Sequence, residues 1–135
     1  MKTQKIISLG LRIIAAVILI QTLYFKFTAH PESVVLFTKL GVEPWGRIGT
    51  GVLELATALL LLLPATAFVG GLLAMGLMMG AVAAHLLVIG IESMADGGQL
   101  FILAIVVLFC SVVIQVMHRQ QGLALARKYF PNAFR

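Results

Sequence analysis

The sequence predicts an all-α integral membrane protein: a four-helix bundle with both termini in the cytoplasm. Of its 135 residues, 61% are hydrophobic and only 11% are charged, and the mean hydropathy is +1.07. A soluble domain carries about 25% charged residues, so the composition excludes that class. The charges are also unevenly placed, because the basic residues gather at the two ends and long segments between them hold almost none. A chain of this length has room for one domain.

Four segments are long and apolar enough to cross a bilayer, which takes about 20 residues per helix. They are residues 6–27, 47–63, 67–91 and 99–117. Pro64 ends the second segment because proline cannot continue the helical hydrogen bonding. Runs such as "LLLLL" and "FILAIVVLF" lack the alternation that a transmembrane barrel needs. A cleaved signal peptide over 1–29 is disfavoured, since Arg12 interrupts its apolar core and Phe27 is bulky near the cleavage site.

Lysine and arginine set the predicted orientation. Most of these residues lie in the two terminal segments, at Lys2, Lys5, Arg12, Arg119, Arg127, Lys128 and Arg135. The positive-inside rule therefore places both termini in the cytoplasm. We expect a multi-pass protein of a bacterial-type inner (plasma) membrane, with a four-helix domain over 1–118 and a basic cytoplasmic tail over 119–135. The acidic residues of the two longer connections then face outward.

Two segments outside the spans have some amphipathic character. In the outer connection 28–46, "SVVLFTKLG" predicts a short surface helix, followed by Trp45 near headgroup depth. The tail alternates bases with apolar residues, which is typical of a segment on anionic lipid, although a tail that only fixes topology explains it equally well. Nucleic-acid binding is a poor interpretation of the net charge of +5, because the bases are split between both ends.

Glu54 is the one acidic residue inside a predicted span, and an ionisable residue there usually faces the bundle interior and pairs with another. It would lie about 10 Å below the outer surface at 1.5 Å per residue. Lys26 would lie at the outer boundary, and Gln21 and His85 about 9 Å deep. The fourth predicted span re-enters the membrane near Asp96 and Gln99. Four predicted spans thus place polar groups at similar depth, in the outer half of the membrane.

The helical faces support convergence of these groups. One stripe of the second span is polar and small, with Arg47, Thr50, Gly51, Glu54, Thr57 and Ala58 at three- and four-residue spacing. On the first span, Thr22 and Lys26 share a face that Gln21 does not. We therefore expect an outward-facing polar pocket with Glu54 as its anion, Lys26 or Arg47 as its counter-charge and His85 in its wall. The predicted ligand-binding residues are Glu54, Lys26, His85, Arg47, Gln21 and Thr50.

Plainer interpretations stay open. Glu54 and Lys26 could form a purely structural ion pair, and His85 could be an interior histidine with satisfied hydrogen bonds. Cys110 is the only cysteine, so this chain has no pair for thiol–disulfide exchange. The three histidines are spread along the topology, so we expect no intrinsic metal or haem site. No GxSxG or HExxH motif occurs in the sequence.

Three stretches resemble the DoxX/DoxD family of small membrane proteins. They are "QTLYFKF", "GVEPWGRIGTGVLELATALLLLLP" and "AVAAHLLVIG", and the similarity covers most of residues 5–118. The resemblance implies a four-helix inner-membrane bundle, and Lys26, Glu54 and His85 match the family pattern. Some members are similar to subunits of thiosulfate:quinone oxidoreductase. Because this chain lacks a cysteine pair, a redox role would need a partner subunit or a diffusible quinone.

Three functions follow as hypotheses. The first is an accessory or quinone-associated subunit of a membrane redox system, which would not be a self-sufficient enzyme. The second is a binder or carrier of a small amphipathic or anionic ligand, for which Glu54→Gln weakens binding and leaves stability nearly intact. The third is a purely structural membrane protein, for which the same change lowers stability. The expected partners are the lipid bilayer, a redox subunit and a second copy of the chain, with quinone as the one expected cofactor.

Overall fold

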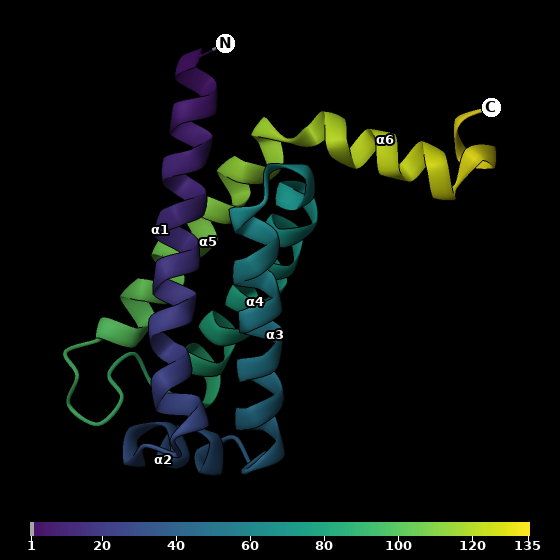
Figure 1. Ribbon diagram of the computed structural model, residues 1–135. Coiled ribbons are helices and arrows are strands. Elements are labelled where there is room, and N and C mark those ends of the chain that lie inside the picture. The colour runs from purple at the N-terminus through teal and green to yellow at the C-terminus, as the bar shows by residue number, and fades with distance from the viewer. Residues whose placement is uncertain (1) are drawn as a thin grey trace.

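The computed structural model describes residues 2–135 and is all-α, with no strand in this range (Figure 1). Its α-helices are α1 (Lys2–Phe27), α2 (Pro31–Lys39), α3 (Trp45–Leu62), α4 (Ala67–Ala84), α5 (Gln99–Met117) and α6 (Arg119–Tyr129). A π-helix, η2 (His85–Ile89), continues α4, and two short 3₁₀ turns, η1 (Pro64–Thr66) and η3 (Pro131–Phe134), complete the described chain. The short helix predicted in the connection 28–46 is present as α2.

Four helices are long and apolar enough to cross a membrane: α1, α3, the continuous segment Pro64–Ile89 and α5. Their outward faces carry large exposed apolar side chains, among them Val17, Leu59, Leu87 and Phe109. An apolar outer surface on helices of this length is what a hydrocarbon solvent requires. The predicted membrane helices are therefore confirmed at the level of length and composition.

Each of the four long helices packs mainly against two of the others. α1 packs against α3 and α5, and α4 packs against the same two helices. Figure 1 shows the start of α1, the α3–α4 turn and α6 at one end of the molecule, here called the terminal end. The opposite end, here called the α2 end, carries α2 and the connection 90–98. At the terminal end α6 leaves the other helices sideways (Figure 1).

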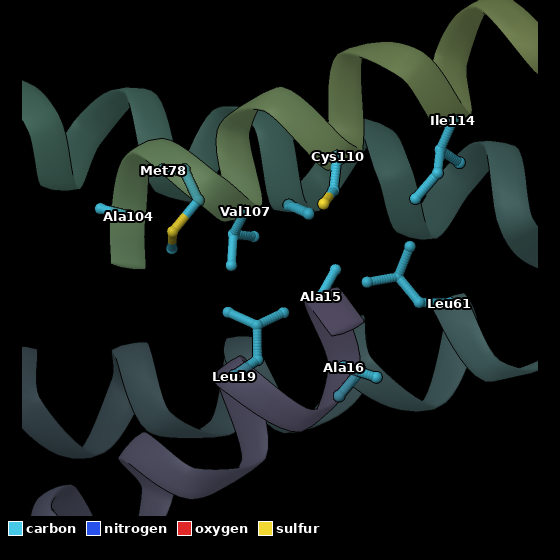
Figure 2. Packing of buried hydrophobic residues seen from close by; sticks show 11 residues of the cluster. Ala15, Ala16, Leu19, Leu61, Met78, Ala104, Val107, Cys110 and Ile114 are labelled. Atoms are coloured by element: carbon cyan, nitrogen blue, oxygen red, sulfur yellow. The ribbon is translucent and has the colours of Figure 1, made fainter. Parts of the chain in front are cut away.

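The interior is built from small and branched apolar residues of all four long helices. Figure 2 shows this cluster, which contains Ala15, Ala16, Leu19, Ala58, Leu61, Ala74, Met78, Ala104, Val107, Cys110 and Ile114. Five of the eleven are alanines, which let helix backbones approach closely where lipid supplies no hydrophobic drive for association.

α3 and α4 approach closely at Gly70. A Cβ atom added at Gly70 would lie 2.7 Å from the backbone nitrogen of Leu61 and 2.9 Å from the backbone carbon of Leu60. The tight turn has a local cause: Leu63 precedes Pro64 and is extended at φ −89° and ψ 124°, as the residue before proline prefers. Two helices joined by so short a turn must run side by side, and Gly70 makes that geometry sterically allowed.

Arg12 ties α1 to the end of α3. Its Nη1 donates to the carbonyls of Leu61 at 3.1 Å and Leu62 at 3.4 Å, which are among the last helical carbonyls and lack intrahelical partners. Its Nε donates to Ser8 Oγ at 3.3 Å, and Ser8 Oγ lies 2.6 Å from His118 Nε2. This network connects α1, α3 and the start of α6.

Two glutamines fix α4 against the C-terminal part of the chain. Gln121 accepts a hydrogen bond from the Phe68 amide at 3.1 Å and donates to the Pro64 carbonyl at 2.6 Å. Gln115 donates to the Phe68 carbonyl at 2.8 Å. These bonds satisfy backbone groups at the start of α4 and hold the first turn of α6 beside the α3–α4 turn.

Burial at the α5–α6 junction lowers the pKa of His118 below its ordinary value, and the nearby positive charge of Arg12 lowers it further. The unfolded chain therefore binds a proton at this site more readily than the folded chain. It follows that the free energy of unfolding decreases as the pH falls below about 6.5. We expect the thermal midpoint in detergent to be lower at pH 5.5 than at pH 7.5. The His118→Gln variant should show a smaller difference between these two pH values. Equal falls in both proteins would show that His118 does not carry the effect.

Candidate functional site

Glu54 lies on the face of α3 that packs against α1, and only 5% of the residue is exposed. Gly51, one turn earlier, leaves room for a side chain of α1. A Cβ atom at Gly51 would lie 2.8 Å from the ring of Phe27, so a larger residue would displace that ring. The stripe of small and polar residues predicted on this helix therefore brings the carboxylate against α1.

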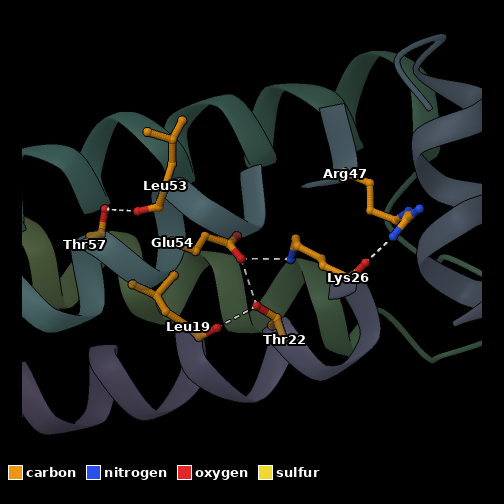
Figure 3. Close-up of polar contacts among 7 residues, drawn as sticks. All are labelled: Leu19, Thr22, Lys26, Arg47, Leu53, Glu54 and Thr57. Carbon is orange, nitrogen blue, oxygen red and sulfur yellow. Dashed lines mark hydrogen bonds and ion pairs between the residues drawn. The ribbon is translucent and has the colours of Figure 1, made fainter. Parts of the chain in front are cut away.

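The Glu54 carboxylate forms an ion pair with Lys26. The Lys26 Nζ atom lies 3.0 Å from Glu54 Oε2, and the two side chains are 10% and 6% exposed. Thr22 Oγ1 lies 3.0 Å from the same oxygen and 2.8 Å from the Leu19 carbonyl (Figure 3). A hydroxyl has one proton, so Thr22 donates to only one of these acceptors at a time. Two donors from α1 thus converge on one carboxylate oxygen of α3.

Arg47 has a different role from Lys26. Its Nε donates to Glu43 Oε1 at 2.8 Å, and its Nη1 donates to the backbone carbonyl of Lys26 (Figure 3). That carbonyl lies in the last turn of α1, where helical carbonyls lack intrahelical partners. Arg47 therefore fastens the end of α1 to the start of α3, and the counter-charge of Glu54 is Lys26.

His85 begins the π-helix, and two hydrogen bonds join it to Gly90. The Gly90 amide donates to the His85 carbonyl at 2.7 Å, and His85 Nδ1 lies 2.8 Å from the Gly90 carbonyl oxygen. A carbonyl oxygen only accepts, so Nδ1 carries the hydrogen of this bond. Gly90 has φ +88°, a backbone conformation that favours glycine. π-turns of this kind are frequent at functional sites.

A cavity of about 480 Å³ lies at the α2 end, between the four long helices and α2. Most of its wall is apolar, with Leu36 and Phe37 from α2 and Leu77, Met78 and Leu103 from the long helices. Its polar lining residues are Gln21, Thr22, Lys26, Glu32, Ser33, Thr50, Glu54, His85, Ser93, Asp96 and Gln99. An apolar chamber with a few fixed polar groups is the usual form of a small-molecule site.

Five of the six residues predicted from the sequence line this cavity: Gln21, Lys26, Thr50, Glu54 and His85. The sixth, Arg47, is outside the lining and is engaged by Glu43. Thr22 was not among the predicted ligand-binding residues, although its shared face with Lys26 was a signal that could have found it. Asp96 and Gln99, which the sequence placed at the same outer depth, also line the cavity. The contribution of α2 had no comparable signal in the sequence.

Asp96 adds a fixed negative charge to the cavity wall. Burial acts to raise the pKa of this carboxyl. Hydrogen bonds from the amides of Leu100, Gly98 and Ser93 outweigh this effect, and His85 adds a smaller contribution, so the pKa lies below its ordinary value. The three amides lie 2.8–3.2 Å from its oxygens. Asp96 therefore stays ionised near neutral pH and orders the start of α5. Over residues 2–135, no group of three His, Cys, Asp or Glu side chains is placed to hold a metal ion.

Comparison with known proteins identifies one family. The sequence model of the DoxX-like family matches residues 10–112, a range that covers most of α1, all of α2, α3, α4 and the π-helix, and most of α5. No curated protein and no solved structure matches the chain.

Proposed function

The chain belongs to the DoxX-like family, and from this premise we propose that it is a quinone-associated accessory subunit of a membrane redox system. In this proposal the protein is a multi-pass four-helix bundle of a bacterial-type inner membrane. The cavity at the α2 end binds the quinone, and a partner subunit exchanges electrons with it. The observation that carries the proposal is the apolar cavity that Lys26, Glu54 and His85 line together.

The charge distribution supports an outward-facing cavity. Seven of the ten basic residues lie in the first twelve or the last seventeen positions, and none of the five acidic residues does. The positive-inside rule assigns such an end to the cytoplasm. The α2 end, and the cavity with it, then opens toward the outer side of the membrane.

The residues of the cavity fit a quinone headgroup. A volume of about 480 Å³ is within the range of pockets that hold molecules of that size. The ring and its apolar substituents would contact Leu36, Phe37 and Met78. The Lys26 ammonium group has three N–H donors and would donate a hydrogen bond to a carbonyl oxygen while it stays paired with Glu54. His85 Nε2, the acceptor of the neutral ring, would take a hydrogen bond from a hydroxyl of the reduced form. When bound, the quinone supplies the redox chemistry, and the chain supplies the binding site.

A ligand-carrying role and a purely structural role remain the competing hypotheses, and the ion pair by itself favours the structural one. The experiment must therefore change the cavity while leaving the ion pair intact. Gly80 lines the cavity, and a Cβ atom there meets no atom within 4 Å. Gly49 on α3 has equally open surroundings and lies outside the lining.

We expect Gly80→Leu to fill the cavity and reduce the bound quinone by about tenfold or more, equivalent to about 1.4 kcal/mol of binding free energy. Gly49→Leu is the matched control and should keep the wild-type content. The measurement is the quinone extracted per mole of protein purified with native lipids. Wild-type protein that retains no quinone would refute the proposal, and another extracted small molecule lost from Gly80→Leu would favour the carrier function.

A further inference from the structure

A second cavity lies at the terminal end, apart from the proposed quinone site. It is open, has a volume of about 930 Å³ and is formed by α1, the α3–α4 turn, the end of α5 and the start of α6. Three cationic side chains line it, Lys5, Arg12 and Arg119. No acidic residue lines it, because all five acidic residues of the chain lie between positions 32 and 96.

Arg12 is the most constrained of these cations. It is 5% exposed, and its hydrogen bonds go only to neutral groups, the Ser8 hydroxyl and the carbonyls of Leu61 and Leu62. Within residues 2–135 the two ion pairs are Lys26–Glu54 and Arg47–Glu43, so no carboxylate neutralises Arg12. A cation withdrawn from water without a counter-charge is costly. Its Nη2 has no hydrogen-bond partner among the described residues and is not fully buried, so it can donate to a ligand.

The other lining groups match a phosphate attached to an apolar molecule. Gln4 and Gln120 bring amide donors. Leu9, Val116 and Met117 add an apolar part to the same wall. A free phosphate ion would use the cations and amides alone, whereas a phospholipid would also contact the apolar residues.

The position of the cavity agrees with a lipid headgroup. The 26 residues of α1 extend about 39 Å, which exceeds the roughly 30 Å of the hydrocarbon core, so its first turns reach the headgroup region. α6 carries exposed Leu123, Leu125 and Tyr129 together with the basic residues of its last turn, Arg127 and Lys128. A basic helix with exposed apolar residues lies in the membrane interface.

From these observations we infer that the cavity at the terminal end binds the phosphate headgroup of an anionic phospholipid, with Arg12, Lys5 and Arg119 as the positive charges. Basic pockets between membrane helices recognise anionic headgroups in this way. The bound lipid neutralises Arg12 and links α1 to the start of α6. The site is independent of the proposed quinone cavity, which lies at the opposite end of the molecule.

The test compares three ligands on wild-type protein in detergent: dihexanoyl phosphatidylglycerol, dihexanoyl phosphatidylcholine and inorganic phosphate. We expect only phosphatidylglycerol to raise the thermal midpoint strongly at low concentration. Equal effects of phosphatidylcholine would overturn the inference, because the charge would not matter. Equal effects of inorganic phosphate would overturn the lipid assignment and indicate a site for a free anion. This comparison does not depend on the folding of any variant.

A matched pair of variants locates the site. Lys5→Gln combined with Arg119→Gln removes two cations that the fold does not use, and it should raise the apparent Kd for phosphatidylglycerol by about tenfold or more. Arg127→Gln combined with Lys128→Gln removes the same charge from α6 outside the cavity and should change the apparent Kd by less than about twofold. Equal losses in both double variants would mean diffuse surface attraction and would refute a defined site.

Discussion

Glu54→Gln lowers the free energy of unfolding by about 3–5 kcal/mol, because it leaves the Lys26 ammonium group without a counter-charge. The side chains of this pair are only 10% and 6% exposed, so water replaces the lost partner poorly. Glutamine is nearly isosteric and can still accept a hydrogen bond from Thr22, so the change isolates the charge. The measurement is equilibrium unfolding in detergent, with helix content as the signal.

Two further variants show whether the loss belongs to the pair. Glu32→Gln also removes a negative charge at the α2 end, but Glu32 is exposed and forms no ion pair among the described residues, so it should change stability by less than about 0.5 kcal/mol. Lys26→Met combined with Glu54→Leu removes both charges and should recover most of the loss. A double variant as unstable as Glu54→Gln alone would contradict this account.

A loss of stability in Glu54→Gln does not distinguish the ligand-binding role of this protein from the purely structural one. The sequence suggested that a ligand-binding Glu54 could be replaced with little effect on stability. The buried pair of 3.0 Å makes a loss of stability the expected result whether or not a ligand binds. A substitution that fills the cavity and leaves the ion pair intact can distinguish a ligand-binding role from a purely structural one. Gly80→Leu is such a substitution.

Gly70→Ala separates α3 from α4 and lowers the free energy of unfolding by about 1–3 kcal/mol. The new methyl group would lie 2.7 Å from a backbone atom of Leu61, and a backbone cannot rotate away as a side chain can. The cost exceeds the roughly 1 kcal/mol that alanine gains over glycine inside a helix. The observable is the thermal midpoint in detergent.

Gly76→Ala is the matched control for this prediction. It makes the same chemical change six residues later in α4, where a Cβ atom meets nothing within 4 Å. There only the helix propensity acts, so stability should rise by up to about 1 kcal/mol. The two substitutions are thus expected to have opposite signs. Stabilisation by both would mean that α3 and α4 pack less closely than the structure shows.

The spans could be predicted because length and hydropathy decide whether a segment can cross a bilayer. The short helix in the connection 28–46 was visible as a run of apolar residues after proline. The π-helix was not visible, since the segment 67–91 reads as one uninterrupted apolar run. Its single wide turn depends on the bonds between His85 and Gly90, which the spacing of apolar residues does not encode.

The candidate site was predicted in part for a similar reason. Glu54, Lys26 and Thr22 share helical faces, and three- and four-residue spacing reports faces directly. Arg47 occupies the same stripe as Glu54 but binds Glu43 and the end of α1, because a helix end offers unpaired carbonyls that a stripe pattern ignores. Asp96 lies in the irregular connection 90–98. Tertiary packing, and not helical spacing, places this connection against the cavity.

The separation of charge along the molecule has an electrical consequence. The terminal end holds seven bases and no acid, while the rest of the chain holds three bases and all five acids, a net charge of −2. The protein is therefore an electric dipole aligned with the long helices. In a membrane whose interior is negative, each charge that crosses the full potential contributes about 2.3 kcal/mol per 100 mV. In the proposed orientation, with the terminal end in the cytoplasm, the resting voltage of the cell would oppose inversion of the molecule, and depolarisation would weaken this opposition.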